Sequence, residues 1–296
     1  MRIEKRRNLF IFLAPTLLFA LVFIAFPLFY SAYLSLSEYN YATDLSPKFI
    51  GFRGYIDTIL HDQFFHNACI NQAKFAVPYF IITFIISLTL AILINELTHG
   101  KNVFQVIFYL PMVISLALVG VLFEWFLFPD VGIFNHLLRV LGIRQWNIDW
   151  FGNPSTSLYG LVIAQAWKNI GFTLIILLAG LQGIPKSIRE AAKVDGAGFL
   201  RETWCIILPN LKPYLFISSV WVLINSMKVF DLPWVVTQGG GPGVSTVTLY
   251  LYSWKLSFER FQMGKAAQVA YITAAIILFL AWGLSHLFRH ETATKA

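Results

Sequence analysis

Long apolar runs recur along the whole of this 296-residue chain and limit what it can fold into. A helix needs about 20 mostly apolar residues to cross the hydrocarbon core of a bilayer. Six runs are long enough, and each carries at most one charged residue. They cover residues 9–37, 75–95, 103–128, 158–183, 214–230 and 266–288. The pattern predicts an all-α, polytopic membrane protein with six transmembrane helices in a single domain, 1–296.

Composition supports a membrane protein. Charged residues make up 12% of the chain, against about 25% in soluble domains. The net charge is +7, but the basic residues lie between the apolar runs. We therefore interpret them as topological charge beside an anionic membrane, with no role in nucleic-acid binding. Two cysteines, Cys69 and Cys205, are too few for a disulfide framework and lack the spacing of a metal site.

The distribution of Lys and Arg predicts the orientation, because basic residues concentrate in cytoplasmic segments. With the N-terminus inside, the inner segments hold 12 of the 22 Lys and Arg residues. These segments are 1–8, 97–102, 184–213 and 289–296. We expect both termini to be cytoplasmic. We also expect Cys69 and Cys205 to lie on opposite sides of the membrane, where they cannot pair.

The inner loop 184–213 is the longest of these segments. Ser187 and Glu190 have capping-box spacing, which predicts a helix that begins at Ser187. Gly196 and Gly198 can end that helix and turn the chain.

A second helical stretch is predicted at 199–208, ended by Pro209. Ala191 and Ala192, in the first helix, are small enough to let a partner approach closely. The residues alone leave two interpretations open. The loop docks in a groove of a soluble protein, or it lies on the lipid headgroups as an amphipathic segment.

A motif in this loop favours docking. Its residues are Glu190, Ala191 and Ala192, then Asp195, Gly196 and Ala197, then Ile206, Leu208 and Pro209. The types and spacing resemble the EAA loop of ABC importer permeases, although Thr203 and Cys205 differ from the residues common at their positions. The resemblance implies that the loop is a coupling helix seated in a cleft of a cytoplasmic ATPase subunit.

Two further segments resemble the sugar branch of that family, which contains the maltose-type and glycerol-phosphate-type permeases. Residues 49–55 resemble an outer F-V-G-L-x-N-Y segment, with Gly54 in place of the usual Asn. Residues 240–242, followed by Thr246 and Tyr250, resemble a G-G-P segment before the last span. The resemblance therefore extends over nearly the whole chain.

This resemblance implies a transport subunit in the inner or plasma membrane of a prokaryote that imports a sugar or oligosaccharide. The implied partners are a second permease subunit, two ATPase subunits and an extracytoplasmic solute-binding protein, besides membrane lipid. ATP and Mg would be used by the ATPase. We expect this chain to bind no cofactor or metal.

Polar residues within the apolar runs are candidates for a solute path. In the fifth run they recur every three or four residues, which places them on one helical face. They are Ser218, Trp221, Asn225 and Lys228, and Asp231 lies just past the outer end of the run, slightly round the same face. A ring, an amide, a hydroxyl and an ammonium group suit a polyol. The alternative is that this stripe packs against other helices.

The fourth run carries a similar group, Gln165, Lys168 and Asn169. A Lys this deep in the membrane requires a partner, and Glu124 in the third run is one candidate. Solute contact is the other interpretation of this group.

An enzymatic role is not indicated. The chain has no P-loop, no HExxH pattern and no triad-like arrangement, so we expect it not to hydrolyse ATP itself. An ion-gradient-driven secondary transporter for a polar solute is the alternative function. Such proteins often contain inverted repeats, and no internal repeat is evident here.

Overall fold

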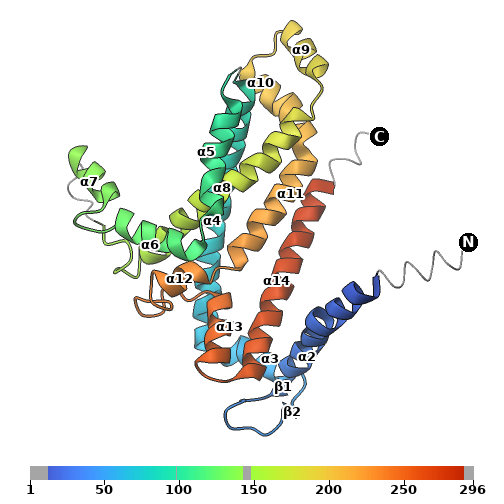
Figure 1. The fold of residues 1–296 in the computed structure, drawn as a ribbon, viewed down its shortest axis with the longest axis vertical. Helices are drawn as coiled ribbons and strands as arrows, with labels where there is room; N and C mark the ends of the chain where they lie inside the picture. Colours follow the sequence, from blue (N-terminus) through green and yellow to red (C-terminus); the bar gives the residue numbers. More distant parts are fainter. Residues whose placement is uncertain (1–12, 98, 143–147, 290–296) are drawn as a thin grey trace, which may run out of the picture. The chain divides into compact units, whose positions relative to one another are not determined.

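The computed structural model describes residues 13–97, 99–142 and 148–289 and is mostly helical (Figure 1). The predicted helical fold is confirmed, with a two-stranded ribbon as an addition. The chain forms two compact units. One comprises residues 1–65 and 252–272, and the other comprises 66–251 and 273–296.

The first unit begins with a helix over residues 13–35. This helix includes a π-helical turn, η1 (Leu21–Ala25), and α2 (Phe26–Ser35). An antiparallel ribbon of β1 (Ser37–Glu38) and β2 (Lys48–Phe49) follows, and then α3 (Arg53–His61). The unit also holds most of α13 (Leu249–Phe258) and the start of α14 (Met263–Arg289).

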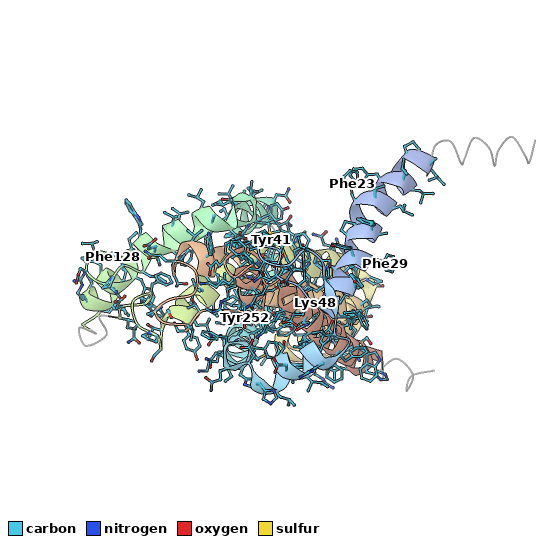
Figure 2. All side chains as sticks on the ribbon, turned by 90° about the horizontal axis from the view of Figure 1, so that it is seen from below. Phe23, Phe29, Tyr41, Lys48, Phe128 and Tyr252 are labelled. Carbon is cyan, nitrogen blue, oxygen red and sulfur yellow. The ribbon has the colours of Figure 1, made fainter. Side chains whose placement is uncertain are left out.

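Apolar side chains of the first helix are largely exposed. Phe23 and Phe29 are 64% and 73% accessible, and both stand out from the ribbon in Figure 2. Such a helix is suited to lipid or to a partner protein, because exposed apolar surface of this extent is unfavourable in water.

A buried carboxylate, Asp62, joins three helices of the first unit. Its Oδ1 accepts the backbone N–H groups of Phe64 and Phe65 at 2.9 and 3.1 Å, at the start of α4 (Gln63–Glu96). Its Oδ2 accepts the Tyr252 hydroxyl at 2.6 Å and is 2.8 Å from Lys265 Nζ. Burial alone would raise the pKa of Asp62, but these partners hold it below its ordinary value.

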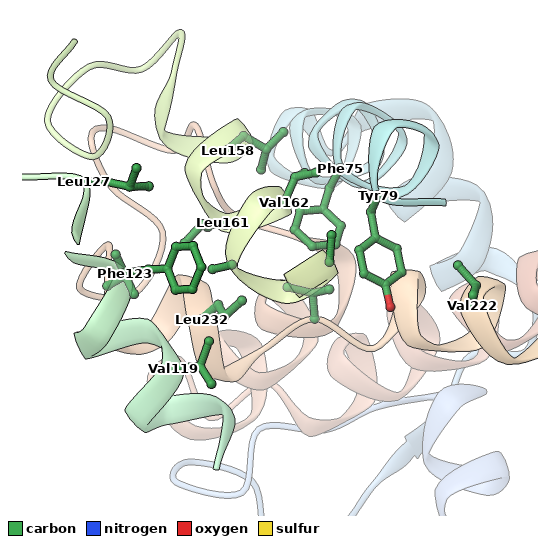
Figure 3. Close-up of a cluster of buried hydrophobic side chains, with 14 residues drawn as sticks. Phe75, Tyr79, Val119, Phe123, Leu127, Leu158, Leu161, Val162, Val222 and Leu232 are labelled. Carbon is green, nitrogen blue, oxygen red and sulfur yellow. The ribbon is translucent and has the colours of Figure 1, made fainter. Parts of the chain in front are cut away.

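The second unit holds most of the remaining helices. They are the rest of α4, α5 (Lys101–Val113), α6 (Leu116–Phe126), α7 (Ile133–Val140), α8 (Ser157–Gln182), α9 (Lys186–Val194), α10 (Phe199–Glu202), the π-helical turn η2 (Thr203–Ile207), α11 (Leu208–Met227), α12 (Asp231–Val235) and the end of α14. Helix α8 is the most buried of the long helices. Its residues pack with α4, α6 and α11 in an apolar core (Figure 3).

Five helices of the described chain are long and apolar enough to cross a membrane, and a bent helix pair raises the number to six. Helix α4 begins well before the predicted span 75–95 because the polar side chains there are satisfied within the protein. Asn71 Nδ2 donates to the carbonyls of Val244 and Val247, and Gln72 Nε2 donates to that of Ser226 at 2.7 Å.

The bent pair corresponds to the predicted span 103–128. Helices α5 and α6 meet at an angle of 101°. Ile114 is extended, and the Ser115 hydroxyl oxygen accepts the N–H of Leu118 to cap α6. The chain therefore restarts its helix in a new direction, with Pro111 in the last turn before the break.

Candidate functional site

Helix α9 occupies the first half of the predicted coupling loop and lies past the ends of α5, α8 and α11 (Figure 1). It begins at Lys186, one residue before the predicted start. It ends at Val194, and Gly196 follows two residues later in the predicted turn, with a φ of +76° in the left-handed region that glycine adopts most readily. The N–H of Ala197 donates to the carbonyl of Ala192 at 2.9 Å, as in a Schellman cap.

The motif residues of α9 do not all face outward. Glu190, Ala191 and Asp195 are exposed, whereas Ala192 is 7% accessible and Ala197 is half-buried. The structure therefore places Ala192 against its own chain. The acidic residues and Ala191 remain available to a partner.

Large apolar side chains are also exposed around α9 and α10. They are Ile188, Val194, Phe199, Leu200 and Trp204. Val194, Leu200 and Trp204 are each at least 70% accessible. Apolar surface gathered beside exposed charges is typical of a site that binds a protein or a membrane.

Leu208 and Pro209 lie at the start of α11, and the prediction that Pro209 ends a helix is wrong. The helix continues from α10 through η2 into α11. In the wide π-helical turn the N–H of Leu208 donates to Thr203, five residues back. The altered hydrogen-bond pattern of this π-helical turn accommodates Pro209, which has no N–H to donate, just after it.

Arg189 links α9 to two other elements, which the sequence did not predict. Its Nε donates to Glu202 of α10 at 2.6 Å, and its Nη2 donates to Glu96, the last residue of α4. Burial alone would lower the pKa of Arg189, but the two carboxylates raise it above its ordinary value. The only sequence signal was an Arg next to the motif Glu190.

The predicted polar stripe of the fifth span is interrupted. Ser218, Trp221 and Asn225 lie on α11, but that helix ends at Met227. Lys228 and Asp231 therefore lie beyond it, and both are exposed. The Ser218 hydroxyl is fully buried and donates to its own helix, at the carbonyl of Leu215.

Amide groups connect the two predicted polar clusters. Gln165 Nε2 of α8 donates to the carbonyl of Asn225 on α11 at 2.9 Å. Asn169 Nδ2 donates to the carbonyl of Gln165, and Asn225 Nδ2 donates to that of Trp221. The structure thus brings Gln165, Asn169, Trp221 and Asn225 together between α8 and α11.

Several buried polar atoms beside these amides have no hydrogen-bond partner among the described residues. They are the Tyr79 and Thr83 hydroxyls, Gln165 Oε1 and the Trp221 indole nitrogen. Figure 3 labels Tyr79. Its hydroxyl lies close to the side chains of Asn169, Thr83 and Gln165. Tyr79 and Thr83 were not predicted; their signal is two hydroxyl residues four apart in an uncharged run. Buried polar groups are normally hydrogen-bonded, so this cluster is a candidate for contact with a polar solute.

Lys168 is satisfied by a backbone group. Its Nζ donates at 2.7 Å to the carbonyl of Met112, which lies in the last turn of α5. The ion pairs of the described residues do not include Lys168 with Glu124, which is exposed. Helices α5 and α8 approach closely here. A Cβ at Gly171 would lie only 2.0 Å from the carbonyl oxygen of Phe108.

Solved and curated proteins resemble the chain over nearly its whole length. It is 31% identical to a probable ABC transporter permease, YurN of Bacillus subtilis, over 97% of each chain. It is 30% identical to the trehalose/maltose transport system permease MalF of Thermococcus litoralis, over 91% of this chain and 89% of that one. One solved bacterial alginate ABC transporter, in complex with an alginate pentasaccharide-bound periplasmic protein, has the same fold. It aligns with a TM-score of 0.83 at 23% identity, over 98% of this chain and 97% of that one.

A family model matches residues 5–290, which is almost the entire chain, and its members are membrane components of transport systems and not enzymes. This chain belongs to the family of binding-protein-dependent transport system inner membrane components.

Proposed function

We propose that the chain is the permease subunit of an ATP-driven, binding-protein-dependent importer of a sugar or oligosaccharide. The observation that carries this proposal is the family match over residues 5–290. A relative named for trehalose and maltose, and a fold relative solved with an alginate pentasaccharide-bound protein, support the sugar class.

The exposed surface of α9 and α10 supports coupling to a separate ATPase. Glu190, Ala191 and Asp195 supply its exposed motif residues, and Trp204 supplies apolar area. Aromatic anchors beside charged groups are common in protein interfaces. In this proposal, loop 184–213 is cytoplasmic, as are both termini, and the protein lies in the inner membrane of a prokaryote.

The amide cluster between α8 and α11 supports a path for a polyhydroxyl solute. Gln165, Asn169 and Asn225 supply donors and acceptors, and the Trp221 indole is suited to the C–H face of a sugar ring. Lys228 and Asp231, exposed past the end of α11, would then lie near one mouth of the path.

ATP would drive the cycle through populations of two states. Two ATPase subunits would bind ATP and Mg, close together and move α9 and its counterpart in a second permease subunit. The spans would then favour the outward-open state, into which an extracytoplasmic binding protein releases its solute. A ligand shifts such an equilibrium only by its differential affinity for the two states. Glu190 should therefore affect coupling more than solute affinity.

Purification of the tagged chain in mild detergent from its native membrane tests this proposal. We expect a P-loop ATPase and a second six-span protein to co-purify. In vesicles, uptake of maltose or trehalose should require ATP and survive ionophores. Reproducible uptake with no ATPase present, abolished by ionophores, would instead establish an ion-gradient-driven transporter.

A further inference from the structure

Helix α9 makes few contacts that hold it in place. Among its described side chains, only Ala192 is buried. On its C-terminal side the chain passes through Gly196 and Gly198, and a Cβ at either position would meet nothing within 4 Å. The backbone connections alone therefore leave α9 weakly fixed.

Arg189 supplies the missing attachment. Its side chain is 19% accessible and lies between two carboxylates, Glu202 at 6% and Glu96 at 35%. The planar guanidinium can donate in two directions at once, which the ammonium of Lys does with less fixed geometry. The carboxylates come from different elements, so one side chain joins α9 to both.

The two carboxylates that Arg189 contacts lie at the ends of two different helices. Glu96 is the last residue of α4, and Glu202 is the last residue of α10, directly before the turn that leads into α11. A carboxylate at a helix C-terminus opposes the helix dipole. The charge of Glu96 alone is therefore unfavourable at the end of α4. The positive charge of Arg189 offsets this unfavourable interaction.

We infer that Arg189 is a positioning residue that makes α9 move as one body with the end of α4 and the start of the α10–α11 segment. This inference rests on the proposed function, in which an ATPase displaces α9. The displacement would reach α4 directly through Glu96, as well as along the chain through α8 and α10.

The test measures the distance between α9 and α4 in the purified complex with its ATPase. Spin labels are placed at Ser187→Cys and Leu93→Cys, both exposed positions, after Cys69 and Cys205 are replaced by Ser. In the parent protein we expect one narrow distance that does not change on addition of ATP, Mg and vanadate. In the Glu96→Gln variant the distribution of distances should become broad and should change when the nucleotide is added.

Glu96→Gln is suited to this test because it removes only one ion pair of Arg189. The ion pair with Glu202 remains, so we expect the variant to fold. Glu259→Gln is the matched control, since Glu259 also forms an exposed ion pair, at 3.7 Å from Lys255, and is 43% accessible. Glu96→Asp keeps the charge and should restore the narrow distance. Arg189→Lys should broaden it.

The outcomes separate the two proposals. A narrow, unchanged distance in both Glu96→Gln and Arg189→Lys, with the ATPase still bound, would overturn the role of Arg189 alone. A parent protein that purifies without an ATPase and transports without one would overturn the proposed function and this inference with it.

Discussion

Gly171 in the middle of α8 provides the sharpest test of how the membrane helices pack. A Cβ there would lie 2.0 Å from the carbonyl oxygen of Phe108 and 2.8 Å from the Cα of Tyr109. Ordinary contact begins near 3.4 Å, so α5 would have to retreat by about 1.4 Å. Backbone atoms cannot rotate away as a flexible side chain can. Gly171→Ala therefore forces the two helices apart.

The expected magnitude follows from two opposing effects. Replacing Gly by Ala inside a helix adds about 1 kcal/mol of stability from helix propensity. Overpacking costs about 1–3 kcal/mol, and more where backbone must move. The clash at Gly171 is with backbone, so we take the upper end of the overpacking cost, about 3 kcal/mol, and expect a net loss of about 2 kcal/mol in the free energy of unfolding.

Gly283→Ala is the matched control, because Gly283 lies inside α14 and a Cβ there would meet nothing within 4 Å. Thermal unfolding of the two variants in the same detergent should show a lower Tm for Gly171→Ala and an equal or higher Tm for Gly283→Ala, relative to the parent. A Gly171→Ala variant as stable as Gly283→Ala would refute the close approach of α5 and α8.

Four further changes test other parts of the chain. Gly196→Pro, which forbids a positive φ, and Glu190→Arg, which reverses an exposed charge, should each abolish uptake in vesicles while the protein stays in the membrane; normal uptake by both would contradict a coupling role for α9. Lys168→Met leaves the Met112 carbonyl unpaired and should lower the free energy of unfolding by about 1–3 kcal/mol, measured against Lys74→Met in α4 as an exposed control. The lowered pKa of Asp62 means that its contribution to stability is complete above its unfolded pKa and is lost as pH falls through the folded value; acidification should therefore lower the free energy of unfolding of the parent more than that of Asp62→Asn, which is the less stable of the two at neutral pH, and an identical acid dependence would contradict this role.

Hydropathy predicted the helices well, because the bilayer requires long apolar runs and little else competes with that signal. Gly196 was also predictable, since a left-handed helix end favours glycine. The early start of α4 was not predictable from the sequence. The polar residues Asn71 and Gln72 look like the boundary before an apolar run. Only their hydrogen bonds to carbonyls far along the chain allow the helix to include them.

The partners of charged residues were the least predictable part of the candidate site. Lys168 was expected to pair with a carboxylate or a solute, but it meets the carbonyl of Met112. A sequence pattern does not indicate which backbone carbonyl a bend will leave without a hydrogen bond inside its helix. Arg189 and Glu96 are likewise separated by 93 residues and are joined only by the fold.

The break between α5 and α6 has a consequence for the order of membrane insertion. The two halves have 13 and 11 residues, or about 20 and 17 Å at 1.5 Å per residue, and neither alone crosses a hydrocarbon core about 30 Å thick. The carbonyl of Met112 finds its donor in Lys168, 56 residues later in synthesis. A nascent chain released from the translocon one helix at a time would expose that carbonyl to lipid. We therefore expect the third and fourth spans to leave the translocon together.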